Sequence, residues 1–249
     1  MQTKSRQVAY REYGYFVERK CFTTIDTKAM TDELDRLWNN INPSSPPSWV
    51  HWRKNTANEL IQDRIDPICP RSELFDSYSK DPRIVSLVNE VLGDTSFVLK
   101  AKAIMKRPAT MGYGAHQDLP YWDSVGLKSH EVLTAAIALD EVTKDHGPLE
   151  LYGKLHHERL PSAPDNELDV DPRVLESVSP EIVTMKPGDV AFFDSLVPHS
   201  SGPNTASSPR RMFLITYAKG GDKKDEIIAN YNSQVKSTHA VHRVNAETA

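Results

Sequence analysis

The feature of this sequence that most restricts its fold is a succession of short strand-like segments after Gly93. Each segment is bounded by turn residues, a pattern typical of a β-sandwich or barrel. The tight turn Lys186-Pro187-Gly188-Asp189 joins two of them directly. The predicted strands lie near residues 96–106, 112–118, 132–139, 148–152, 182–186, 189–194 and 211–218. We therefore expect a core made mainly of β-structure.

Two helices are predicted before the strands. Apolar residues recur at helical spacing over about 29–41, after Asp26-Thr27, which can cap the helix. The second helix is expected to begin at Pro82, with Asp81 as its N-cap, and to end at Gly93. Because the helices stand before the strands rather than between them, the order favours an antiparallel β core with flanking helices over a doubly wound sheet.

Length and composition indicate the broad class of protein. A length of 249 residues suits one β-rich domain better than two small ones. The net charge of −4 argues against a nucleic-acid binder. Two cysteines exclude a disulfide scaffold and are compatible with a reducing compartment. The sequence has no signal-like segment and no apolar run of about eighteen residues, so we expect a cytoplasmic protein without a membrane span.

We expect one domain over residues 1–249. Its predicted parts are a helical N-terminal layer over about 1–94, a β core over about 95–220 and a C-terminal tail over about 221–249. An acidic, proline-bearing insert at 161–181 interrupts the strands. Two interpretations stay open: a solvated loop with one short helix near 172–178, or a lid over the open end of the core.

The strongest chemical signal is the pair His116 and Asp118 in one predicted strand. Side chains two residues apart in a strand project to the same face, so both can offer a ligand atom to one ion. His199, which follows a later strand, is the best third ligand. Two histidines and one carboxylate leave open positions that suit iron(II), although catalytic zinc sites use the same ligand types.

Arg210 favours an iron(II) site over a zinc site. It opens an apolar strand, and a guanidinium buried in an apolar core needs an anionic partner. The distal carboxylate of 2-oxoglutarate would supply that partner. If the strand is regular, its neighbour Arg211 points to the opposite face.

Several motifs together resemble the phytanoyl-CoA dioxygenase (PhyH) family over roughly residues 95–220. The motifs are His116-Gln117-Asp118, Leu139-Asp140-Glu141, Gly147-Pro148-Leu149, Pro198-His199-Ser200-Ser201-Gly202-Pro203-Asn204 and Arg210. The resemblance implies a double-stranded β-helix core, of the jelly-roll or cupin-like kind. It also implies an iron(II)- and 2-oxoglutarate-dependent dioxygenase, which hydroxylates an unactivated carbon of a small molecule and releases succinate and carbon dioxide.

Further positions carry over by resemblance to a hydroxylase of the family. Tyr113, Ser201 and Lys106 match residues that help to hold 2-oxoglutarate, beside Arg210. Trp122 matches a tryptophan that contacts substrate, although its alternative reading is a core aromatic residue.

Three lysines of one predicted strand, Lys100, Lys102 and Lys106, share one face of that strand. This face is either solvated or lines the mouth of the core. In the second case the ammonium groups need anions, and the substrate would itself be anionic, held by Lys100 or Lys102. A different class of function, a non-oxidative metal-dependent barrel enzyme or a metal-binding sensor, is disfavoured by Arg210. We expect a small-molecule substrate, with neither nucleic acid nor membrane as a partner.

Overall fold

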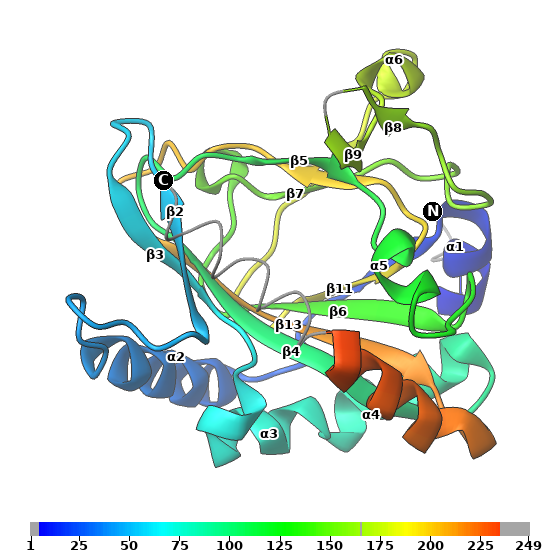
Figure 1. The fold of residues 1–249 in the computed structure, drawn as a ribbon, viewed down its shortest axis with the longest axis horizontal. Helices are drawn as coiled ribbons and strands as arrows, with labels where there is room; N and C mark the ends of the chain where they lie inside the picture. Colours follow the sequence, from blue (N-terminus) through cyan, green and yellow to red (C-terminus); the bar gives the residue numbers. More distant parts are fainter. Residues whose placement is uncertain (1–4, 165, 235–249) are drawn as a thin grey trace.

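The computed structural model describes residues 5–164 and 166–234, which form two antiparallel sheets that face each other (Figure 1). The larger sheet has seven strands in the order β1-β11-β6-β13-β4-β3-β2. Its strands are β1 (Tyr15–Glu18), β2 (Val50–Lys54), β3 (Leu60–Ile65), β4 (Ser96–Lys106), β6 (Val132–Ala138), β11 (Val190–Asp194) and β13 (Arg210–Lys219). Two facing antiparallel sheets, with helices outside one of them, form the mainly β core that the sequence predicts.

The smaller sheet has six strands in the order β10-β7-β12-β5-β9-β8. Its strands are β5 (Tyr113–His116), β7 (Leu149–Leu151), β8 (Ser162–Ala163), β9 (Asn166–Val170), β10 (Glu181–Val183) and β12 (His199–Ser201). It lies above the larger sheet in Figure 1. Every strand pair described in the two sheets is antiparallel.

Helices cover the outer face of the larger sheet (Figure 1). The labelled helices are α1 (Arg6–Tyr13), α2 (Thr24–Asn39), α3 (Glu73–Ser79), α4 (Pro82–Leu92), α5 (Leu119–Asp123) and α6 (Pro172–Leu175), with 3-10 turns at Cys69–Arg71, Lys144–His146 and Gly221–Lys223. Of these, α2, α3 and α4 lie on this outer face, whereas α6 lies beside β8 of the smaller sheet. As predicted, α4 is capped by Asp81 and ends at Gly93 in the left-handed conformation. Helix α2 begins earlier than its apolar stripe because Thr23 and Asp26 form a capping box.

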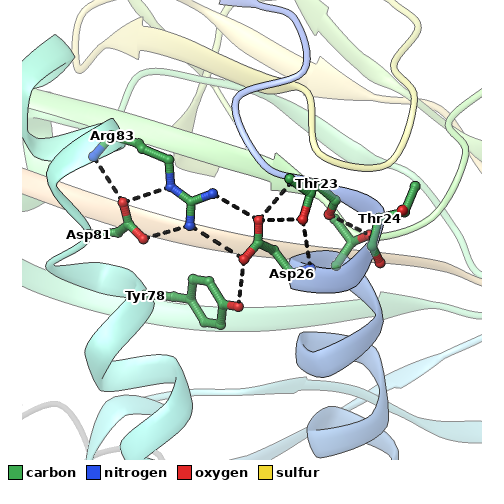
Figure 2. Close-up of polar contacts among 7 residues, drawn as sticks. Thr23, Thr24, Asp26, Tyr78, Asp81 and Arg83 are labelled. Carbon is green, nitrogen blue, oxygen red and sulfur yellow. Dashed lines mark hydrogen bonds and ion pairs between the residues drawn. The ribbon is translucent and has the colours of Figure 1, made fainter.

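A polar network ties α2 to α4 (Figure 2). The Arg83 guanidinium donates to Asp26 Oδ2 at 2.8 Å and to Asp81 Oδ2 at 2.7 Å. The Tyr78 hydroxyl donates to Asp26 Oδ1 at 2.9 Å. Hydrogen bonds from Arg83, Thr23 and Tyr78 outweigh the effect of burial and hold the pKa of Asp26 well below its usual range. The helical layer is therefore linked by charge as well as by its apolar contacts with the sheet.

Strand β4 shows how the sheet separates its two faces. Ala101, Ala103 and Met105 belong to the hydrophobic cluster shared with the helices. The alternate residues Lys102 and Lys106 point to the other side, toward the smaller sheet, because side chains alternate along a strand. The interior between the sheets is consequently polar along β4.

The N-terminal region is less helical than the sequence predicts. Besides its helices, residues 1–94 contribute β1, β2 and β3 to the larger sheet. The insert at 161–181 contains α6 and also the strands β8 and β9, which extend the smaller sheet. In the tail, residues 224–234 are helical, and Ile227 is buried against the core. Among the described helices, none is long and apolar enough to cross a bilayer.

Candidate metal centre and co-substrate site

The two predicted histidine ligands lie on paired strands of the smaller sheet. His116 ends β5 and His199 begins β12, and the register places them opposite each other. Asp118 Oδ1 lies 3.9 Å from His116 Nε2 and 4.0 Å from His199 Nε2. One ligand atom from each of the three residues lies within 4.8 Å of the others. The structure therefore brings together all three predicted ligands.

Asp118 reaches this position differently from the prediction. Strand β5 ends at His116, and Asp118 has helical backbone angles as the first residue of the turn into α5. The chain thus leaves the sheet immediately after the first histidine. Thr134 on β6 donates to Asp118 Oδ2 at 3.4 Å, which orients the carboxylate from the opposite sheet.

Backbone carbonyls orient both imidazoles. The Nδ1 of His116 donates to the Gly114 carbonyl at 2.9 Å, and that of His199 to the Val197 carbonyl at 3.0 Å. Each Nε2 is then left as the unprotonated ligand atom, the arrangement that metal-binding histidines usually show.

The charges of the site suit a divalent cation. Burial and the neighbouring His116 lower the pKa of His199 to about 4, so its imidazole is neutral at neutral pH. Burial opposes ionisation of Asp118, but His199, His116 and Lys102 hold its pKa below the usual value. The side chains of His116 and Asp118 keep exposures of 22% and 19%. A metal here would have accessible coordination positions.

Gln117, between the two ligands, holds the loops around the site. Its side-chain amide donates to the carbonyls of Glu158 and Leu196, and its oxygen accepts from the Leu160 amide. The insert approaches the same place, since Asp169 of β9 pairs with His116. Strand β9 of the insert therefore lies directly beside the first histidine ligand.

Arg210 lies inside the core beside Lys106, its register partner on β4. The residue is 3% exposed, and its buried Nε has no hydrogen-bond partner among the described residues. Burial lowers the pKa of Arg210 to about 10. A buried, incompletely satisfied guanidinium is costly unless an anion binds it.

Lys106 is a second buried basic residue at this place, with 0% exposure. Its ammonium donates to Ser201 Oγ at 2.8 Å and to the Gly202 carbonyl at 2.6 Å. Burial and the nearby Arg210 lower the pKa of Lys106 to about 6. The residues predicted to hold 2-oxoglutarate are thus neighbours, and their charge favours an anionic ligand.

Tyr113 adjoins this pair on β5, opposite Ser201 on β12. Its hydroxyl donates to Asp63 Oδ2 at 2.6 Å, and the Arg53 guanidinium lies 3.9 Å from its ring centroid. Burial and Asp63 raise the pKa of Tyr113 to about 12, so its hydroxyl stays protonated as a hydrogen-bond donor.

Arg211 faces the other way, as the alternation predicts. It donates to both carboxylate oxygens of Asp140 and, at 2.8 and 2.9 Å, to those of Asp35 on α2. These bonds raise its pKa against the effect of burial. The predicted strand register is therefore confirmed.

Lys100 and Lys102 lie on the inner face of β4. Lys100 Nζ pairs with Asp66 Oδ2 at 2.9 Å. Lys102 is enclosed by protein yet keeps partial exposure, and it lies within the electrostatic reach of Asp118. The lysine face therefore lines the interior rather than the outer surface.

Trp122 lies elsewhere. It is 6% exposed and packs in a hydrophobic cluster with Phe97, Leu99 and Ile227. The structure thus favours the core interpretation of this residue over contact with substrate.

The hairpin β2–β3 brings charged residues that the sequence reasoning missed. Arg53, Asp63, Arg64 and Asp66 all lie beside the lysine face or Tyr113. The available signal was two short segments with β-branched or aromatic residues around the turn at 55–59, where Asn58 adopts a positive φ of 64°.

The arrangement defines a facial two-histidine, one-carboxylate centre beside an anion-binding site in a double-stranded β-helix. The sequence model of the family described as phytanoyl-CoA dioxygenase (PhyH) matches residues 10–212. The chain belongs to this family and is an iron(II)- and 2-oxoglutarate-dependent dioxygenase, a hydroxylase of small molecules. This confirms the oxygenase prediction over a non-oxidative enzyme or sensor.

Individual relatives extend along most of the chain. Methylphosphonate hydroxylase from Gimesia maris is 26% identical over 232 residues, covering 92% of this chain and 86% of the relative. A 2-aminoethylphosphonate dioxygenase from an uncultured bacterium (HF130_AEPn_1) is 27% identical over 228 residues, covering 86% and 81%. The solved structure of EctD from S. alaskensis, with 2-oxoglutarate and 5-hydroxyectoine, has a TM-score of 0.72 at 20% identity and covers 87% of this chain and 76% of its own. This likeness supports the predicted fold.

Proposed function

We propose that this enzyme hydroxylates a small molecule that carries an anionic group. The observation behind the proposal is the position of Lys100 and Lys102, which face the interior close to Asp118. Burial lowers the pKa of Lys102, so an anion beside it is needed to keep its ammonium charged, and a neutral substrate would supply none. The two phosphonate-oxidising relatives act on compounds that carry such a group.

In this proposal His116, Asp118 and His199 bind iron(II). Its chemistry with 2-oxoglutarate places one oxygen atom of dioxygen on the substrate carbon and the other in succinate, with release of carbon dioxide. The paired β5 and β12 hold the two imidazoles in register, while the turn into α5 and Thr134 of the larger sheet position Asp118.

The residues around Arg210 bind the co-substrate. Arg210 anchors one carboxylate with its buried fork, while Ser201 and Lys106 contribute hydrogen bonds and charge from the adjoining strands. Tyr113, whose hydroxyl donates to Asp63, borders the same place with its ring, 5.6 Å from Lys106 Nζ. The unpaired Nε of Arg210 supports this assignment because the guanidinium retains a donor for a ligand.

The charge requirement of the substrate can be tested with a panel of small molecules that share a carbon skeleton and differ in head group. Succinate formation should rise above the substrate-free rate with phosphonates, phosphates or carboxylates. Neutral and cationic analogues should leave it at the substrate-free rate. Equal stimulation by neutral analogues would contradict an anionic substrate.

Lys102→Met is expected to raise the substrate KM by about thirtyfold or more, because losing one partner of a buried charge pair costs about 2–5 kcal/mol. Lys28→Met is the matched control. Lys28 pairs with Asp32 on the exposed face of α2, where an ion pair contributes little. Similar KM values for the two variants would remove Lys102 from the substrate site.

A further inference from the structure

A cluster of three basic residues lies where β3 meets β4. It consists of Arg64, Lys100 and Lys102, arranged around the carboxylate of Asp66. Lys100 Nζ lies 2.9 Å from Asp66 Oδ2, whereas Arg64 Nε lies 3.8 Å from the same oxygen. The Asp66 carboxylate is thus shared by two cations, and it pairs closely with Lys100 but only distantly with Arg64.

The Arg64 guanidinium makes only long contacts with the described residues, and its side chain is 31% exposed. Its shortest contact is to Asp63 Oδ2 at 3.2 Å, followed by His51 Nδ1 at 3.5 Å. Charged hydrogen bonds are normally about 2.7–2.9 Å long, and a guanidinium has five N–H donors. Arg211 in the same protein shows the normal case, with contacts of 2.7–2.9 Å to Asp140 and Asp35. The Arg64 fork therefore keeps the capacity to bind a further anion.

Lys102 has a similar deficit. Within residues 5–164 and 166–234, no carboxylate lies within ion-pair distance of its ammonium. Its charge interacts with both Asp118 and Asp66, so this member of the cluster adjoins the metal ligands as well as Asp66. An anionic group held by Lys102 and Arg64 would place the attached carbon beside the metal centre.

The balance of charge indicates the valence of the missing anion. Arg64, Lys100 and Lys102 face two carboxylates, those of Asp63 and Asp66, which leaves one positive charge in excess. The loaded metal centre adds none, because iron(II) and Arg210 together balance the carboxylate of Asp118 and the two carboxylates of 2-oxoglutarate. The Arg53 guanidinium, 3.9 Å from the ring centroid of Tyr113, adds a second positive charge near Asp63. A dianion would neutralise both charges, whereas a carboxylate would neutralise only one.

We infer that Arg64, Lys100 and Lys102 form the binding site for a dianionic, tetrahedral phosphonate head group. This inference rests on the proposed function and specifies its substrate class. Arg64 binds two of the three oxygens through its fork, and the lysines bind the third and add charge. Asp66 is an internal carboxylate that neutralises part of this charge and competes with the head group for Lys100 and Arg64.

Calorimetric titration of the anaerobic iron(II)–2-oxoglutarate holoenzyme can test the inference. The probes are methylphosphonate and methanesulfonate at a pH where the phosphonate is a dianion. Both are tetrahedral and of similar size, and they differ in charge. The wild-type protein should prefer methylphosphonate by about tenfold or more.

Variants of the cluster should change this preference in opposite directions. Arg64→Ala should weaken methylphosphonate binding by about tenfold to a hundredfold and abolish the preference over methanesulfonate. Asp66→Asn should tighten methylphosphonate binding, because it releases Lys100 and Arg64 while keeping the shape of the side chain. Arg36→Ala on the exposed face of α2 is the control and should retain wild-type affinities.

The dianion site and the anionic character of the substrate can be contradicted separately. If the wild-type holoenzyme prefers methanesulfonate, or if Arg64→Ala retains the wild-type preference, the dianion site is wrong even though the substrate is anionic. Weaker methylphosphonate binding by Asp66→Asn would also overturn the inference. If the wild-type protein binds neither anion and couples only to neutral compounds, the proposed function fails as well.

Discussion

His199→Ala should abolish both iron binding and turnover. His199 contributes one of three ligand atoms from a buried position, and its Nδ1 bond to Val197 fixes the ring, so no neighbouring group replaces it. Loss of an outer partner of a ligand already costs about 10–100-fold in metal affinity, and loss of the ligand itself should exceed that. The measurement is iron(II) content after anaerobic loading, together with the weak visible band expected when 2-oxoglutarate is added.

The control for this experiment is His157→Ala. His157 is an exposed histidine whose ring stacks on His156 and lies outside the metal cluster. Its removal should leave iron content and the band unchanged. A band that survives in His199→Ala, or in the parallel variant His116→Ala, would show that the ligand assignment is wrong.

Arg210→Ala should raise the KM for 2-oxoglutarate by about thirtyfold or more while iron binding persists, because a broken buried charge pair costs about 2–5 kcal/mol. Arg210 is buried in the interior and does not belong to the metal cluster. Its loss should therefore affect the co-substrate alone. The measurement is the dependence of succinate formation on 2-oxoglutarate concentration, with iron content determined in parallel.

The adjacent residue provides the matched control. Arg211→Ala should lower the free energy of unfolding, since Arg211 bonds to Asp140 and to Asp35 of α2, but the KM for 2-oxoglutarate should not change. The two variants thus separate stability from co-substrate binding on neighbouring positions. If Arg211→Ala raised the KM and Arg210→Ala did not, the proposed role of the inner face of β13 would be wrong.

The metal ligands could be predicted from the sequence because their chemistry restricts the choice of residues. A His-x-Asp pair, a later histidine and a buried arginine are required together, and the structure brings the three ligand groups into one cluster. The backbone conformation expected for these ligands was only partly correct. Asp118 reaches the site from the first turn of α5 and not from an extended strand.

The N-terminal strands could not be predicted from the sequence alone. Strands β2 and β3 are short and rich in charged residues, and their pairing depends on the edge offered by β4. Neither Asp63 nor Arg64 carries a local signal of burial. Their contacts can be recognised only when β3 lies against β4. This pairing places Asp63 next to Tyr113, and Asp66, just after β3, next to Lys100.

Trp122 shows the opposite limit. Its position after Asp118 suggested contact with substrate, but the short helix α5 turns its ring toward Phe97 and Ile227. The cluster includes a residue of the helical segment 224–234, which no pattern near the metal ligands indicates. Sequence spacing therefore placed this residue close to Asp118 along the chain without fixing the direction of its side chain.

Oxygen transfer tests the central claim most directly. The enzyme would be supplied with iron(II), 2-oxoglutarate, methylphosphonate and isotopically heavy dioxygen, and the products analysed by mass spectrometry. The account predicts one heavy oxygen atom in succinate and one in the hydroxylated product, in amounts that match each other. A hydroxylated product that carried ordinary oxygen from water, or succinate that never exceeded the level formed by His199→Ala, would contradict it.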